Sequence, residues 1–368
     1  MADFMIPTAG LTRWIVELFT AAGSSAREAE LTAHHLVGAN LTGHDSHGVG
    51  MAPRYVNSLL GDELKLNQTA KIVHDAGSVV TIDGMRGMGQ SVTHQAMEIA
   101  IERARANGVC VMGLRNSHHL GRVGHWAEQA IAANLVSIHF TNAVSNPPMV
   151  SPWGGSQARY ITNPFTVGIP RADGKPIVLD FATSAIAHGK VRVAYNKKVQ
   201  VPPNSLIDVD GNPTVEPRVM FEPPEGPHGA LLPFAAHKGY ALAMVCELLG
   251  AALTGGETTQ PANLKMKHAI WNNMLAIVFD PAKMGSGERF EQEARSFVDW
   301  VRSARLSDVG KELGGILMPG DPERISRAKR EQALPIDAGT MAQMDAAAAA
   351  VAERFGKSPG ALSALALD

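Results

Sequence analysis

Apolar residues recur along much of this chain at helical spacing, and short continuous apolar runs lie between these segments. The segments with helical spacing are residues 11–21, 25–41 and 90–106. They predict amphipathic helices, because residues three and four apart share one helix face. Ser25 and Glu28 have the spacing of a capping box at the start of the second helix. Asn107 and Gly108 are typical of a helix end and predict where the third helix stops.

The short apolar runs predict buried strands, because runs of about four to eight such residues fit the interior of a sheet. They cover residues 109–114, 135–140, 161–169, 177–181 and 274–279. Two further helices are expected at residues 121–133 and 341–355, the second from its alanine-rich composition. Residues 196–233 are rich in proline and glycine and predict loops and a hairpin. The whole pattern predicts an α/β chain with a mixed sheet.

Composition narrows the choice of partners. The 368 residues suffice for one compact unit or two closely joined domains. Lysine and arginine total 33 against 35 acidic residues, so a formal charge of -2 gives no general attraction to nucleic acid or to an anionic membrane. Cys110 and Cys246 lie in apolar segments and are expected to be reduced core thiols. Since no leader pattern or long apolar span is found, we expect a cytoplasmic protein whose partners are small molecules or other copies of itself.

Three polar clusters carry candidate chemistry. His44 and His47 lie within residues 43–48, His118 and His119 lie within residues 116–122, and His237 opens residues 237–240. Histidine titrates near neutral pH, so it is the usual carrier of a proton in an enzyme at cellular pH. These clusters indicate an acid/base site.

His47 is the first candidate for the acid/base residue, because Asp45 and Ser46 stand beside it and can orient its ring. His119 is the second candidate. His44 and His118 are expected to be structural. Although His44 and His47 have the spacing of a metal pair, no further ligands stand at suitable spacing, so no metal is expected.

The glycine fingerprint of the doubly wound dinucleotide fold is absent. A pyrophosphate would then need another helix start, and Gly121, Arg122 and Val123 offer one at the expected helix 121–133. Asp180 is expected to end a strand. There its carboxylate either accepts from a hydroxyl or an imidazole, or caps the backbone of Ala182 and Thr183.

Several runs together resemble the type-2 malate/L-lactate dehydrogenase family, and within it the hydroxycarboxylate dehydrogenase B branch. They are GHDSHG at 43–48, NSHHLGRVGHWAEQA at 116–130, TNPF at 162–165, LDFATS at 179–184 and HKGYALAMVCELLGAALTGG at 237–256. The resemblance implies a mixed-sheet α/β fold that binds NAD or NADP without the doubly wound architecture, with a helical region formed by the chain termini. Residues 1–75 and 300–368 would form that helical region, for dimerisation and substrate, and residues 76–299 would bind the cofactor.

The resemblance also implies site residues. His47 and His119 would be catalytic, and Arg54, Tyr55 and His119 would bind substrate. The implied cofactor contacts are His47, Gly121, Arg122, Val123, Asp180, Phe181, Ala182, His237, Lys238, Gly239, Tyr240, Gly320, Asp321, Pro322 and Glu323. One departure concerns Met51, which stands where relatives commonly have an arginine for the substrate carboxylate.

These residues predict an NAD(P)-dependent oxidoreductase that interconverts a 2-hydroxy acid and its 2-keto acid, with His47 as acid/base. The resemblance implies a homodimer. The alternative on the same scaffold is a reductase of a cyclic imino acid. From other classes, a histidine-rich metallohydrolase and a non-catalytic nucleotide-binding module stay open.

Overall fold

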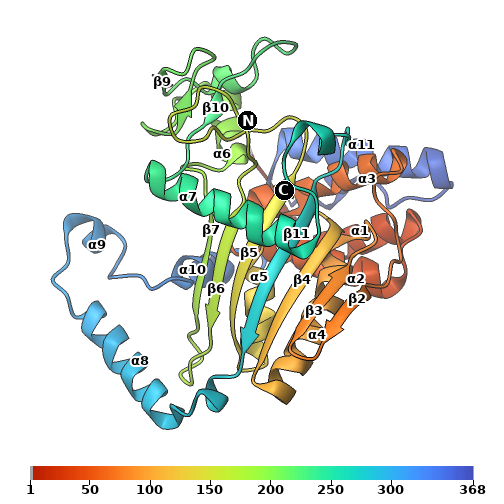
Figure 1. Ribbon diagram of the computed structural model, residues 1–368. Coiled ribbons are helices and arrows are strands. Elements are labelled where there is room, and N and C mark those ends of the chain that lie inside the picture. The colour runs from red at the N-terminus through yellow and green to blue at the C-terminus, as the bar shows by residue number, and fades with distance from the viewer. Residues whose placement is uncertain (1–2, 368) are drawn as a thin grey trace.

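A seven-stranded mixed sheet forms the centre of the computed structural model, which describes residues 3–367 (Figure 1). The strand order is β2-β3-β4-β11-β5-β6-β7, in which only β3 and β4 are parallel neighbours. The strands are β2 (Lys71–Ala76), β3 (Val79–Asp83), β4 (Val109–His118), β5 (Val136–Val144), β6 (Pro164–Ile169), β7 (Ile177–Ala182) and β11 (Trp271–Phe279). β7 is therefore an edge strand, and the long apolar strands β4 and β11 lie inside the sheet.

Helices cover both faces of this sheet (Figure 1). α4 (Gly89–Asn107) and α5 (Gly124–Ala132) pack on one face, where they contact β4, β5 and β6. On the other face lies α7 (His237–Val245), which continues as a π-helix over Cys246–Ala251. This π-helix contacts β5 and β11. α4 ends at Gly108, whose φ of 90° suits glycine and closes the last turn.

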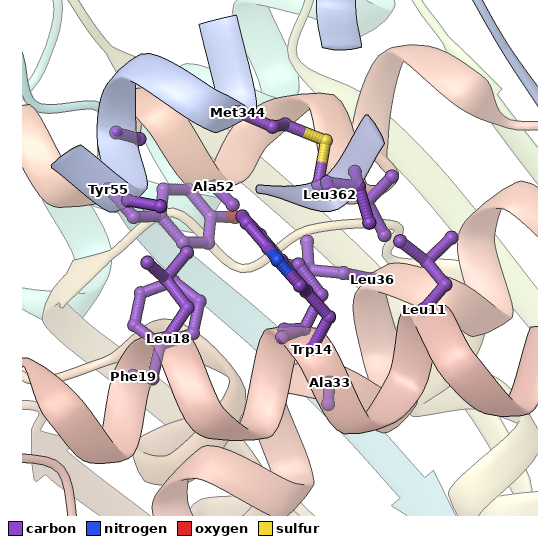
Figure 2. Packing of buried hydrophobic residues seen from close by; sticks show 14 of the residues in the cluster. Leu11, Trp14, Leu18, Phe19, Ala33, Leu36, Ala52, Tyr55, Met344 and Leu362 are labelled. Carbon is purple, nitrogen blue, oxygen red and sulfur yellow. The ribbon is translucent and has the colours of Figure 1, made fainter. Parts of the chain in front are cut away.

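A second, helical body is built from both ends of the chain (Figure 2). It contains α1 (Thr8–Ala21), α2 (Ala26–Leu41), α3 (Ala52–Leu60) and α11 (Ala338–Phe355). Leu18, Leu36 and Met344 have no exposed surface in its core. Each such side chain stabilises the fold by about 1.5–3 kcal/mol relative to an exposed one.

Two short strands tie the termini together. β1 (Asp3–Pro7) pairs antiparallel with β12 (Ala333–Asp337), so that the fully buried Ile6 and Leu334 lie opposite each other. The ten-residue helix α10 (Asp321–Arg330) leads into β12 and packs against α2. Within residues 3–367, no helix is both long and apolar enough to cross a membrane.

The remaining elements lie outside these two bodies. α6 (His188–Lys197) precedes a small sheet of β8 (Leu206–Ile207), β9 (Pro213–Thr214) and β10 (Ala230–Leu231). α8 (Gly287–Arg302) and α9 (Asp308–Glu312) form an arm that extends from the body (Figure 1). Phe297 and Trp300 on this arm are 64% and 72% exposed.

The predicted α/β fold with a mixed sheet is confirmed, and most elements lie where the apolar pattern placed them. Ser25 caps α2 as expected, because its hydroxyl accepts from the Glu28 N–H. The reciprocal half of the capping box is wrong: the Glu28 carboxylate instead accepts from the Ser24 hydroxyl and the Asn67 N–H. Cys110 and Cys246 are buried free thiols. The domain boundaries at residues 75 and 300 stay predictions.

Candidate active site

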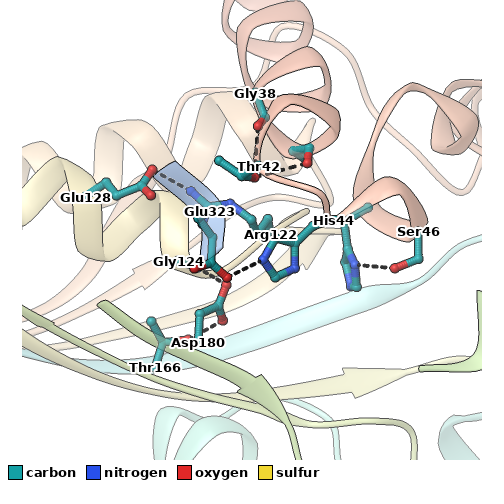
Figure 3. Close-up of polar contacts among 12 residues, drawn as sticks. Gly38, Thr42, His44, Ser46, Arg122, Gly124, Glu128, Thr166, Asp180 and Glu323 are labelled. Carbon is teal, nitrogen blue, oxygen red and sulfur yellow. Dashed lines mark hydrogen bonds and ion pairs between the residues drawn. The ribbon is translucent and has the colours of Figure 1, made fainter. Parts of the chain in front are cut away.

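The first histidine cluster forms a short 3-10 turn, η1 (Asp45–His47), directly after α2 (Figure 3). Gly43 lets the chain leave the helix, because its φ of 83° lies in the left-handed region. The Ser46 hydroxyl lies 3.0 Å from Nδ1 of the half-buried His47. Burial lowers the pKa of His47 to about 4, and the neighbouring His44 adds to the effect. His47 is therefore neutral at cellular pH.

Polar contacts from the C-terminal part of the chain hold this turn in place. His44 Nε2 lies 3.0 Å from a carboxylate oxygen of Glu323 in α10. The Asp45 carboxylate accepts from the Asn40 amide and from the Arg330 guanidinium, each at 2.7 Å. The expectation that Asp45 orients His47 is thus wrong, because its carboxylate turns to Asn40 and Arg330 and makes no hydrogen bond with the His47 ring. Only Ser46 of the two neighbours contacts the ring.

The second cluster brings His119 next to His47, with ring centroids 5.7 Å apart and planes inclined by 23°. The Tyr55 hydroxyl lies 2.7 Å from His119 Nδ1 and accepts from the Gln90 amide at 3.0 Å. Because the Gln90 amide fills an acceptor position on this oxygen, the Tyr55 proton is free to point at Nδ1. Burial lowers the pKa of His119 well below its ordinary value, and the neighbouring His47 ring adds to the effect because two imidazoles this close disfavour protonation of both. The ring is therefore neutral, with its remaining proton on Nε2.

Unlike His119, His118 is held by packing and, within the described part of the chain, not by hydrogen bonds to its ring. Its ring is fully buried, lies edge-on to Tyr55 at 5.1 Å, and neither ring nitrogen has a hydrogen-bond partner among residues 3–367. Burial lowers its pKa to about 3. This packing agrees with the structural role expected for His118.

Arg54 brings a positive charge to the same place. Its Nε donates to the His268 carbonyl at 2.6 Å and its Nη2 to the Ser145 hydroxyl at 2.9 Å. Nη1 has no partner among the residues that the structure describes. The guanidinium lies near enough to His119 to help lower its pKa. One donor of this half-buried cation is thus open to a carboxylate.

The structure adds His188, which the sequence analysis missed, to this group. It is the first residue of α6, and burial with the charges of Arg192 and Arg54 lowers its pKa to about 4. The next residue, Gly189, lies against the η1 turn, since a Cβ there would approach the Ser46 Cβ to 2.8 Å. No sequence signal marks His188, because only the packing of α6 on η1 brings it near His47.

Met51, the departure from the family pattern, packs against the helical body. It lies at the end of η2 (Val49–Met51), one residue before α3. Its side chain is half-buried.

The expected cofactor loop lies just before α5, and here one prediction is corrected. The helix begins at Gly124, not at Gly121, so Gly121, Arg122 and Val123 form a loop at its start. The Gly124 N–H donates to an Asp180 carboxylate oxygen at 2.9 Å (Figure 3). The first N–H of the helix is therefore satisfied by a carboxylate of this chain.

Asp180 itself lies inside β7 and does not end it. Its second oxygen accepts from the Thr166 hydroxyl at 2.8 Å. The alternative in which Asp180 caps Ala182 and Thr183 is wrong, because the carboxylate turns back to β6 and α5. The other alternative was a carboxylate that accepts from a hydroxyl or an imidazole. Asp180 does accept from a hydroxyl, that of Thr166, and its other partner is a helix N–H instead of an imidazole.

Arg122 is buried beneath this loop, with 3% of its surface exposed. One terminal nitrogen pairs with Glu128, and the other, Nη1, has no partner among residues 3–367. Although burial opposes the charge, Glu128 and Asp180 raise the pKa of the guanidinium. The guanidinium therefore stays charged, pairs with Glu128 and lies near enough to Asp180 to feel its charge.

The residues around Asp180 fit the sugar part of a dinucleotide better than its pyrophosphate. Asp180, Glu128 and Glu323 outnumber the charge of Arg122, and carboxylates bind ribose hydroxyls in dinucleotide sites. At Gly124 a Cβ would come within 2.6 Å of Asp180 and 2.8 Å of Arg122 Nη1, so only glycine leaves this space open. An orphaned donor and a space without Cβ next to it are compatible with a bound polar group.

A pocket of about 250 Å³ continues from this point towards α10. Its lining residues come from the end of α2, from α5, from the start of β7 and from α10 with its N-cap, and include Thr42, Glu128, Val178, Gly320 and Glu323. Asp321, the first residue of α10, accepts from the Met318 N–H in the preceding turn at 2.7 Å and pairs with Arg302 and Arg324. Asp321 therefore shapes the turn, Pro322 follows it as the second residue of α10, and Gly320 and Glu323 face the pocket.

The remaining predicted cofactor contacts are Phe181, Ala182 and residues 237–240, of which Phe181 and the helix residues belong to the other face of the sheet. Successive side chains of a strand point to opposite faces, so Phe181 points away from the face that Asp180 occupies, and Ala182 follows at the strand end. The Phe181 ring contacts Phe234 at 5.3 Å, and Gly239 in α7 packs against the Phe234 backbone.

His237 and Lys238 start α7 and are exposed, whereas Tyr240 lies 6.1 Å from the Tyr160 ring. The structure thus gathers His47, His119, Arg122, Asp180 and Glu323 around one side of the edge strand β7. It places the residues of α7 around the other side.

Comparisons with known proteins agree with this architecture. A sequence model of the malate/L-lactate dehydrogenase family matches residues 6–345. Hydroxycarboxylate dehydrogenase B of Escherichia coli strain K12 is 48% identical over 332 residues, which cover 90% of each chain. The chain therefore belongs to the malate/L-lactate dehydrogenase family. The family and these relatives indicate hydroxy acid dehydrogenase activity, so the protein is an oxidoreductase.

Solved structures lead to the same family. A putative malate/lactate dehydrogenase from E. coli superposes with a TM-score of 0.90 at 45% identity, covering 98% of both chains. Delta1-piperideine-2-carboxylate reductase from Pseudomonas syringae pvar. tomato superposes with a TM-score of 0.79 at 31% identity, covering 94% of this chain and 99% of that chain. Among residues 3–367, no three His, Cys, Asp or Glu side chains are grouped so that they could hold a metal ion.

Proposed function

We propose that this protein is an NAD(P)-dependent dehydrogenase that interconverts a 2-hydroxy acid and its 2-keto acid, with His47 as the acid/base. The observation that carries the proposal is the pair of neutral imidazoles of His47 and His119, 5.7 Å apart. A hydroxyl holds Nδ1 of each ring, from Ser46 in one case and from Tyr55 in the other. Each ring is thereby fixed in orientation while its Nε2 is left for a substrate.

When bound, the nicotinamide ring accepts the hydride that leaves the carbon of the substrate alcohol. The hydroxyl proton of the same alcohol must go to a base, and His47 Nε2 receives it in the proposed reaction. For this step Nε2 must carry a lone pair, so the neutral ring holds its proton on Nδ1. The Ser46 oxygen then accepts from Nδ1–H both before and after the transfer. In the reverse reduction His47 Nε2 gives the proton to the carbonyl oxygen.

His119 and Arg54 are proposed to bind the substrate. The Nε2–H of neutral His119 is a donor for an oxygen of the substrate, and the free donor of Arg54 suits its carboxylate. His188 lines the same space from α6. On the cofactor side, Asp180 and Glu323 are proposed to accept from ribose hydroxyls, with Gly121 to Val123 and Gly320 alongside. His237 to Tyr240 and Phe181 stay predictions for the opposite side of β7.

Reduced-nicotinamide absorbance tests the proposal. The protein is incubated with NADH or NADPH and a panel of 2-keto acids, with and without a chelator. We expect absorbance to fall with at least one keto acid, equally in both conditions. Metal dependence without nicotinamide turnover would favour the metallohydrolase class, and cofactor binding without turnover across the panel would favour a nucleotide-binding module.

A cyclic imino acid reductase is the second candidate, because the Pseudomonas syringae reductase shares the fold over most of both chains. Adding delta1-piperideine-2-carboxylate to the same panel separates the two. A kcat/KM for the imino acid above that for every keto acid would replace the first proposal. A homodimer and a cytoplasmic location are further proposals, and sedimentation of the purified protein tests the first of them.

A further inference from the structure

The loop that precedes α5 is held from beneath by a histidine of another helix. His35 lies on α2, is 1% exposed, and its Nε2 accepts the Arg122 backbone N–H at 2.8 Å. Gly121 packs directly on the same nitrogen, since a Cβ there would lie 2.1 Å from Nε2. Gly121 has a φ of 73°, which suits glycine. Both the hydrogen bond and the close contact thus meet at one ring nitrogen.

The surroundings of His35 fix its protonation. Because Nε2 accepts, the ring proton lies on Nδ1, which has no hydrogen-bond partner among residues 3–367. The ring packs between His125 at 4.4 Å and Trp126 at 5.1 Å. Burial lowers its pKa well below the ordinary value, and the groups that add to this effect are His125, Arg122, His119 and His34. With cations or other histidines on these sides, the ring stays neutral and its Nε2 stays an acceptor.

We propose that His35 is a positioning residue for the cofactor, which acts by holding the Gly121–Val123 loop in its binding shape. This inference rests on the proposed function, since the loop matters to the reaction only if a dinucleotide binds there. No other described side chain accepts the Arg122 N–H. Without the acceptor, this buried N–H loses its partner and the loop gains access to other conformations. The apparent Kd of the cofactor then rises, because it equals the intrinsic Kd divided by the fraction of molecules whose loop keeps the binding shape.

Substitutions that keep or remove the acceptor test the proposal. His35→Gln can place its carbonyl oxygen near the position of Nε2, whereas His35→Asn is too short and His35→Leu has no acceptor. We expect His35→Leu and His35→Asn to raise the Kd of NADH or NADPH about tenfold, as an unpaired buried N–H costs enough for such a shift. His35→Gln should stay near the parent. Titration of protein fluorescence gives the Kd without turnover.

The control separates positioning from general loss of stability. Leu36 is the next residue of α2 and is fully buried in the helical body (Figure 2). Leu36→Ala should lower Tm at least as much as the His35 variants, because such truncations cost about 2–5 kcal/mol. Its Kd should nevertheless match the parent. Hydrogen exchange of the peptide containing Arg122 should quicken in His35→Leu and His35→Asn, but not in Leu36→Ala.

Three outcomes decide the matter. If the parent protein binds neither NADH nor NADPH, the proposed function is wrong, and the positioning role of His35 is wrong with it. If the parent binds but His35→Asn and His35→Leu bind equally well, the positioning role is wrong. If Leu36→Ala weakens binding as much as they do, His35 acts only through stability. Should His35→Leu fail to fold, the pair His35→Gln and His35→Asn still gives the answer, since both side chains are neutral amides of different reach.

Discussion

The pKa of His47 leads to a pH dependence that differs from that of an ordinary histidine enzyme. Burial lowers this pKa from 6.5 to about 4. Keto acid reduction needs the protonated ring, whose share at pH 7 is about one in a thousand at a pKa of 4, against about one in four at 6.5. Oxidation needs the neutral ring, which is present in nearly full amount above pH 5. The two directions therefore respond to pH in opposite ways.

We expect kcat/KM for reduction to rise about tenfold for each unit by which the pH is lowered between pH 7.5 and 5. The reason is that kcat/KM reports the pKa of His47 in the enzyme before substrate binds. In the oxidation direction kcat/KM should be flat over the same range. Initial rates at saturating cofactor and low substrate, at constant ionic strength, measure both. His47→Gln should lower kcat by about 10²–10⁴ and abolish the slope.

His139 provides a matched control for this measurement. It is fully buried, its pKa is also lowered to about 4, and it bonds Ser137 inside the sheet. His139→Gln should keep the slope. A reduction rate that levels off near pH 6.5 would refute the reasoning, because the pKa of the proton carrier would then be close to its ordinary value. A slope that survives in His47→Gln but disappears in His119→Gln would make His119 the acid/base.

Three further outcomes are expected. Tyr55→Phe should raise the KM for keto acid about tenfold while kcat changes less, because His119 loses the donor on Nδ1; equal losses in both constants would contradict a binding role. Met51→Arg should raise kcat/KM for oxaloacetate relative to monocarboxylic keto acids about tenfold, since an aligned charge pair contributes about 1.5–3 kcal/mol. An unchanged ranking would show that the side chain does not reach substrate. Finally, Tm should fall as pH drops from 6.5 towards 3. His118 and His125 have a pKa of about 3 in the folded protein and 6.5 in the unfolded chain, so the unfolded state takes up protons first and is stabilised as the pH falls. A constant Tm across this range would contradict their buried neutral state.

The sequence was informative wherever an interaction is local. Helical periodicity placed α1, α2 and α4, alanine-rich composition placed α11, and the adjacency of Ser46 and His47 already indicated how the ring is held. The start of α5 was misplaced for a non-local reason. Asp180, from a strand more than fifty positions later, takes the Gly124 N–H and fixes the first turn there.

The partners of the site histidines could not be predicted from sequence. Tyr55 reaches His119 across 64 positions, and His44 reaches Glu323 across 279. His35 gave no signal at all, because it reads as one more residue on an amphipathic helix. Such pairs depend on how helices pack onto the sheet, which single-chain periodicity does not encode.

The pairing of β1 with β12 bears on how the enzyme is made. Synthesis proceeds from the N-terminus, so α1, α2 and the η1 turn leave the ribosome long before their partners. Asp45 must wait for Arg330, and Ile6 must wait for Leu334. During that interval the apolar faces that α1 and α3 later pack against α11 lack this partner. A chain that ends before residue 330 would thus contain His47 but lack the Arg330 contact that holds the turn around it.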